Sequence, residues 1–169
     1  MAEGFREPAS LLPLRWGGYR SRYLGALVLL VAGGLLIQAT SVYAIYLLVA
    51  GAAAHLAGWL ILPGRGWRRV AVSLPSMIGT AGPLIGSFGA LLLVLCLLGW
   101  LWVRQRPGRA YPVLVFPVIS AIVLSRLFPQ YGDGGIVVLV SLVVLVGSAW
   151  LARAVAGGGG RSAAGETGR

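Results

Sequence analysis

The sequence predicts an all-α integral membrane protein, a bundle of about six transmembrane helices. Of its residues 58% are hydrophobic, and the mean hydropathy is +0.87. Only 11% are charged, whereas soluble chains carry about 25%. Two long stretches, residues 23–62 and 70–103, contain no formally charged residue. A chain with so little polar surface is typical of proteins whose solvent is lipid.

The first uncharged stretch predicts two helices. Crossing the hydrocarbon core takes about 20 apolar residues, and residues 23–62 provide enough for two crossings with a tight turn near residues 38–41. The stretch ends in the segment 63–69, in which Pro, Gly and three arginines oppose continuation of the helix.

The second uncharged stretch allows several arrangements. One straight helix over residues 70–103 would be too long for a core of about 30 Å, and Pro75 and Pro83 interrupt it. It therefore forms two spans, one long kinked span or a re-entrant segment, and the last would leave five full spans plus a short broken one. Residues 113–127 and 136–155 predict the remaining spans.

Three regions follow from this pattern. Residues 1–22 form a basic N-terminal segment, which we expect to be uncleaved and cytoplasmic. Residues 23–156 form the transmembrane domain. Residues 157–169 open with four glycines and predict a disordered cytoplasmic tail.

The distribution of arginine favours six crossings. All fourteen basic residues are arginine, and arginine is enriched in cytoplasmic loops. If residues 70–103 leave and return, every arginine except Arg126 lies on the side of both termini, whereas a single crossing divides them almost evenly. The six tryptophans also lie close to arginine clusters. Together with the absence of Lys and Asn, which suggests a GC-rich bacterial genome, this predicts a bacterial inner-membrane protein with both termini in the cytoplasm.

The most informative motif lies in residues 75–89. Gly79, Gly82, Gly86 and Gly89 are spaced by three, four and three residues, which places them on one stripe if the segment is a single helix. We favour a close-packing seam with a kink. The alternative is a broken or re-entrant helix whose backbone lines a binding site, and hydroxyl groups nearby would suit it: Ser73, Ser76, Thr80 and Ser87. A second small-residue seam, which we expect to serve packing alone, comprises Ala50, Ala54 and Gly58.

Three ionisable residues are further candidates. His55 is the single histidine and lies in the second expected span, where an ionisable group is a functional hypothesis by default. We favour a neutral imidazole bonded to a hydroxyl or carbonyl of another helix over a proton-relay or substrate-contact role. Arg126 and Asp133 flank the turn before the last span and could pair at the surface. Such a pair stabilises by about 0–1 kcal/mol, and a role in gating or cargo contact is the less favoured reading.

Several functional classes lack their residues. The sequence shows no metal-binding cluster, no intramembrane carboxylate pair, no phosphate-binding loop and no evident nucleophile–base pair. We therefore expect no enzyme and no cofactor. The arginines occur in short runs between apolar stretches, which indicates topology rather than binding of nucleic acid.

Two functions remain. We favour a non-catalytic accessory or scaffold subunit of a membrane complex, with membrane lipid and a partner membrane protein or a second copy of the chain as partners. The alternative is a small transporter, channel or substrate-binding component for a neutral or apolar solute, with residues 75–89 lining the site.

Overall fold

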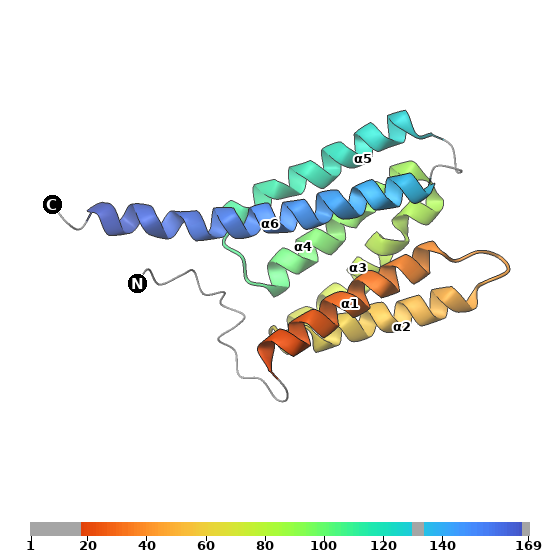
Figure 1. Cartoon of the computed structure of the whole chain (residues 1–169), viewed down its shortest axis with the longest axis horizontal. Helices are drawn as coiled ribbons and strands as arrows, with labels where there is room; N and C mark the ends of the chain where they lie inside the picture. Colours follow the sequence, from red (N-terminus) through yellow and green to blue (C-terminus); the bar gives the residue numbers. More distant parts are fainter. Residues whose placement is uncertain (1–17, 130–133, 167–169) are drawn as a thin grey trace.

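The protein is all-helical in the part of the chain that the structure, a computed structural model, describes: residues 18–129 and 134–166, with side chains to residue 157. Within these residues there are no strands, so the all-α prediction is confirmed (Figure 1). The α-helices are α1 Tyr19–Gln38, α2 Tyr46–Ile61, α3 Gly66–Ala81, α4 Val94–Val103, α5 Val115–Leu127 and α6 Gly134–Glu166. The 3-10 helices are η2 Gly82–Ile85, η3 Ser87–Leu93 and η4 Gly108–Leu114.

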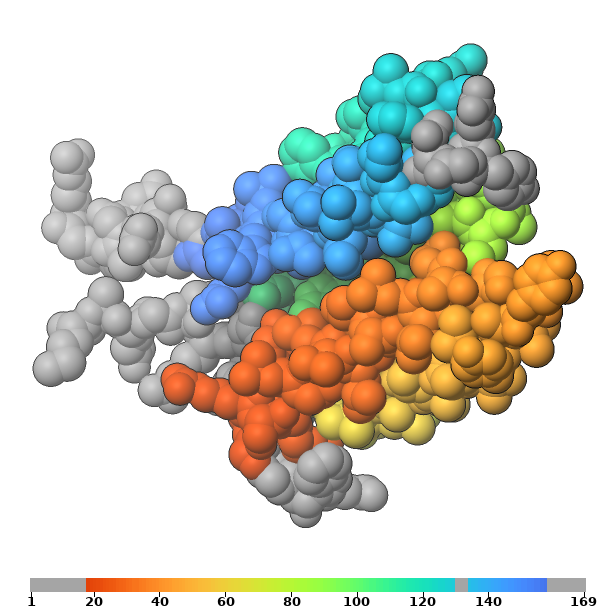
Figure 2. All heavy atoms as spheres, turned by 45° about the vertical axis from the view of Figure 1, so that its right-hand side comes forward, coloured from red at the N-terminus to blue at the C-terminus, as the bar shows by residue number. Residues whose placement is uncertain are grey.

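Successive helical segments run in alternating directions. The connections α1–α2 and η2–η3, the end of α5 and the start of α6 lie at one end of the bundle in Figure 1. The connections α2–α3 and α4–η4 lie at the other. In the space-filling view α1 and α2 lie on one side of α6, and α5 lies on the other (Figure 2).

Three helical segments are long and apolar enough to cross a membrane. They are Tyr19–Gln38, Gly108–Leu127 and Gly134–Gly157. Tyr46–Ile61 and Ser87–Val103 are apolar but shorter. A helix of 16 residues, such as α2, is about 24 Å long, which is less than the core of about 30 Å.

Glycines bring α1 and α2 into backbone contact. A Cβ at Gly33 would lie 2.6 Å from the backbone nitrogen of His55 and 2.7 Å from the carbonyl oxygen of Gly51. Close approach of this kind, which small residues permit, is typical of helix pairs in membranes.

Of the predicted seam along Ala50, Ala54 and Gly58, Gly58 lies at the contact with α1. That residue is buried against Leu30 and Ala26 of α1, whereas Ala50 is exposed and Ala54 is half-buried. Because residues 51, 55 and 58 follow the 3.6-residue period more closely than 50, 54 and 58 do, the contact face is rotated toward Gly51 and His55.

The segment 70–103 reverses direction. Helix α3 continues through Pro75 and ends at Ala81, and the chain turns through η2 and Gly86 before returning as η3 and α4. Gly86 has φ 115°, a conformation that favours glycine. The four glycines of the motif therefore do not share one helical stripe. The 3-10 helix η2, with Pro83 in its first turn, follows α3, and it ends just before Gly86.

The last helix is longer than expected. Helix α6 continues to Glu166 and includes most of the tail that the sequence predicts to be disordered. The segment 134–166 contains no proline, so each residue can add one hydrogen bond to a helix that is already nucleated.

Candidate functional site: a buried polar network between four helices

The imidazole of His55 joins three helices. Its Nε2 atom lies 2.9 Å from Oγ of Ser76 in α3, and its Nδ1 atom lies 3.3 Å from the carbonyl oxygen of Leu30 in α1. The indole Nε1–H of Trp59, one turn further along α2, donates to the same Nε2 atom at 3.2 Å. His55 is 4% exposed and Ser76 is fully buried.

The chemistry of these partners fixes the tautomer. An indole N–H can only donate, so Nε2 of His55 must accept. Ser76 then donates its hydroxyl proton to the same nitrogen, and Nδ1–H donates to Leu30. The histidine is thus neutral, with its proton on Nδ1. Of the two interpretations drawn from the sequence, this geometry is that of a neutral imidazole bonded to a hydroxyl and a carbonyl of other helices.

A second group of polar contacts continues along α3. The hydroxyl of Thr80 donates to the carbonyl oxygen of Ser76 at 2.8 Å, and the thiol of Cys96 in α4 donates to the same oxygen at 3.3 Å. The side-chain amide of Gln38, the last residue of α1, donates to the carbonyl oxygen of Thr80. The polar network, defined as Gln38, His55, Trp59, Ser76, Thr80 and Cys96, therefore ties α1, α2, α3 and α4 together.

Sequence reasoning identified half of this network. His55, Ser76 and Thr80 were candidates, and the structure brings them together. Gln38, Trp59 and Cys96 were not. The sequence did contain a signal for Trp59, because a tryptophan four residues after a histidine lies on the same helical face. Gln38 on α1 and Cys96 on α4 become partners only through the packing of the helices.

Comparison with protein-family models, with curated proteins and with solved structures gave no match.

The glycines of the motif line the reversal and pack against one another. A Cβ at Gly79 would lie 2.6 Å from the carbonyl oxygen of Leu92. Gly82 and Gly89 face each other across the turn, and a Cβ on either would collide with the carbonyl oxygen of the other. The backbone at the reversal is therefore packed against backbone.

The other predicted residues lie apart from the network. Ser87 begins η3 and is half-buried, and Ser73 bonds within its own helix, to the carbonyl oxygen of Val70 at 2.7 Å. Arg126 is at the end of α5 and is exposed. Asp133 lies outside the described residues, and so does the pairing expected of it with Arg126.

The contact between Ser76 and His55 corrects one expectation. A hydroxyl hydrogen-bonded to a histidine nitrogen is the arrangement of a nucleophile and its base. The sequence alone had shown no such pair, and the structure brings these two residues together across 21 positions of the chain. In this conformation, however, Ser76 is fully buried and Trp59 shares the nitrogen that would take its proton. The contact joins α2 to α3, and Trp59 joins it from within α2.

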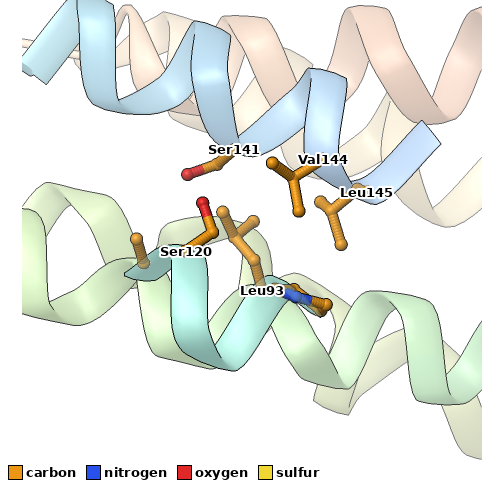
Figure 3. A pocket seen from close by; sticks show the side chains of 7 residues that line it. Leu93, Ser120, Ser141, Val144 and Leu145 are labelled. Carbon is orange, nitrogen blue, oxygen red and sulfur yellow. The ribbon is translucent and has the colours of Figure 1, made fainter. Parts of the chain in front are cut away.

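A separate small void lies between α5, α6 and η3 (Figure 3). The hydroxyls of Ser120 and Ser141 point toward one another there, among the apolar side chains of Leu93, Val144 and Leu145. The space does not admit a water molecule, so we do not interpret it as a binding site.

Proposed function

We propose that this chain is a non-catalytic, multi-spanning membrane protein that serves as a subunit or scaffold of a membrane complex. In this proposal its segments cross a bacterial inner membrane six times, with both termini in the cytoplasm. The two parts of the proposal, membrane placement and subunit role, are supported by different observations.

Helix α3 supports placement in a membrane because its polar face points into the protein and its apolar face points outward. Its hydroxyl-bearing residues Ser73, Ser76 and Thr80 are at most 7% exposed. Val70, Leu74 and Ile78 point outward and are 51–64% exposed. Water favours the opposite arrangement, whereas lipid favours apolar side chains outside and polar groups bonded to one another inside.

The positions of the arginines support the orientation. Side-chain contacts join the starts of α1 and α3 to the ends of α2 and α4: Arg22 donates to the carbonyl oxygen of Ile61 and Arg68 to that of Trp102. Arg109 at the start of η4 donates to the carbonyl oxygen of Ala156 in α6. This end of the bundle, the basic end, would face the cytoplasm under the positive-inside rule.

The closed interior is the observation that favours a subunit over a transporter. The alternative places a binding site at residues 75–89, but there the hydroxyl of Ser76 bonds to His55 and that of Thr80 to backbone, and Gly82 packs on Gly89. A solute would have to displace these contacts. The outer faces, by contrast, offer apolar side chains to other helices or to lipid.

Purification in a mild detergent tests the proposal. We expect the full chain, expressed at its natural level in its own host, to be recovered with a partner membrane protein in fixed stoichiometry. Recovery of a monodisperse single chain, together with flux of a solute after reconstitution into vesicles, would contradict the subunit role and support the transporter.

A further inference from the structure

A cluster of arginine and tryptophan lies at the basic end, where α3 begins and α4 ends. The guanidinium carbon of Arg68 lies 5.5 Å from the ring centroid of Trp67 and 5.2 Å from that of Trp102. The two indoles meet edge to face, with centroids 5.1 Å apart. One guanidinium nitrogen, Nη1, donates to the carbonyl oxygen of Trp102 at 2.9 Å. The cation is therefore held in place by two rings and a backbone acceptor.

The charge of this cluster is not neutralised within the described part of the chain. The side chains that the structure describes include no carboxylate, because the four acidic residues fall outside them: Glu3, Glu7, Asp133 and Glu166. Arg65, which precedes α3, is exposed and adds a second positive charge.

Other arginines raise the positive potential at the same end. Arg104, in the α4–η4 connection, is buried against Tyr23, with its guanidinium carbon 4.8 Å from the ring centroid. Burial, together with the charges of Arg106 and Arg153, lowers the pKa of Arg104 to about 10. With a pKa of about 10, Arg104 still carries its charge at neutral pH.

An apolar stripe begins at the cluster and runs along α3. Trp67, Val70, Leu74 and Ile78 succeed one another at spacings of three and four residues, which place them on one helical face. Each is more than half exposed. A charged group at one end of a long apolar surface matches an amphiphile with an anionic head and a hydrocarbon chain.

We propose that Arg65, Arg68, Trp67 and Trp102 form a site for the phosphate of an anionic phospholipid, whose acyl chain lies along Val70, Leu74 and Ile78. The exposed guanidinium of Arg65 can bind phosphate oxygens through two parallel hydrogen bonds. Arg68 adds a second, fixed positive charge beside it, and indole rings prefer the level of the head groups. The apolar stripe favours a lipid over free phosphate or an acidic protein segment, neither of which would use it. The inference rests on the proposed membrane placement and identifies the lipid class that this face binds.

Native mass spectrometry of the purified full chain tests the site. The protein, in a non-ionic detergent, is titrated in separate arms with phosphatidylglycerol, phosphatidylcholine and inorganic phosphate. We expect phosphatidylglycerol to bind most tightly and inorganic phosphate not to be retained. Replacing Arg65→Gln or Arg68→Gln should each weaken phosphatidylglycerol binding about fivefold, because an arginine near an anionic surface contributes about 1 kcal/mol.

Matched variants separate the site from general charge and from folding. Arg126→Gln removes an arginine at the opposite end and should leave the affinity unchanged. Arg65→Gln removes a side chain at the surface, so it remains informative if Arg68→Gln reduces stability through the lost bond to Trp102. Equal affinities of all three variants for phosphatidylglycerol, or equal binding of phosphatidylcholine, would overturn the site.

The result also separates this proposal from the subunit role, since the titration uses the isolated chain and needs no partner. Retention of no phospholipid at all by a chain that sediments with membranes would contradict the site alone. Absence of the chain from the membrane fraction would contradict the membrane placement on which both proposals rest.

Discussion

The Nε2 atom of His55 lies 2.9 Å from Oγ of Ser76, and this contact joins α2 to α3 in the interior of the bundle. It belongs to a network whose hydrogen bonds link four helices, so its role is to fix how the helices pack. Hydrogen bonds between membrane helices contribute about 0.6 kcal/mol on average and about 1.7 kcal/mol at most. Several such hydrogen bonds together favour one arrangement of the helices over others that bury a similar apolar surface.

Replacing Ser76→Ala should lower the free energy of unfolding by about 0.6–1.7 kcal/mol, because Nε2 of His55 keeps Trp59 as a donor. His55→Leu should have the larger effect, since it leaves the buried donors of Ser76 and Trp59 without an acceptor, at about 1–3 kcal/mol for each. Unfolding by sodium dodecyl sulfate in mixed micelles, followed by circular dichroism, measures both. If the double variant loses the sum of the two single losses, the two side chains are not coupled and the network is misassigned.

Gly82→Ala should destabilise the protein by about 1–3 kcal/mol, the usual effect of overpacking, because the new methyl group meets the backbone of Gly89. The matched control is Gly147→Ala in α6, where no atom of a neighbouring helix lies within 4 Å of the position that the new methyl group would take. That change should stabilise the helix by about 0.5–1 kcal/mol. The same unfolding assay compares the two. A neutral effect of Gly82→Ala would indicate that the reversal is more open than described, which would favour a binding site at residues 75–89.

Gly33→Ala should disrupt the contact between α1 and α2, whereas Ala50→Leu should be tolerated. The first adds a methyl group 2.6 Å from the backbone nitrogen of His55, and the second enlarges an exposed side chain. Yield of monodisperse protein after size-exclusion chromatography distinguishes them. Loss of folded protein for Ala50→Leu would instead support the helix contact along Ala50, Ala54 and Gly58 that the sequence predicts.

Gln105→Gly should stabilise the protein by about 0.5–1 kcal/mol. Gln105 follows α4 with φ 55°, and the backbone nitrogen of Arg106 bonds to the carbonyl oxygen of Leu101 at 3.0 Å. This is the hydrogen-bond pattern of a helix end that usually contains glycine at the left-handed position. Thermal unfolding in detergent provides the comparison, with Gln105→Ala as the control that keeps the strained backbone and should not stabilise.

The helices were predictable from composition and from proline and glycine, and the contacts between them were not. Long apolar stretches place α1, α2, α5 and the apolar part of α6, and Pro83 and Gly86 mark the reversal. The sequence did not reveal that Pro75 stays within a helix, because a proline in the interior depends on neighbouring helices to satisfy the freed backbone groups.

The candidate site shows the same division. His55 could be predicted as a candidate because ionisable groups are rare in the apolar stretches. Ser76 and Thr80 could be predicted because they carry hydroxyl groups near a segment broken by proline and glycine. The contact between His55 and Ser76 depends on which face of α2 is turned toward α3. The glycine contacts between α1 and α2 set that rotation. A rotation of one residue along α2, as in the predicted seam at Ala50 and Ala54, would have directed His55 elsewhere.

Topology mapping tests most directly the central claim that the segments cross a membrane six times with the basic end in the cytoplasm. At each of four positions, after Ser41, Arg65, Arg109 or Asp133, two separate fusions are made. One carries a reporter that is active only in the periplasm, and the other carries a reporter that is active only in the cytoplasm. We predict periplasmic activity after Ser41 and Asp133 and cytoplasmic activity after Arg65 and Arg109. Strong periplasmic activity after Arg109 would contradict the account, because residues 70–103 would then cross the membrane only once.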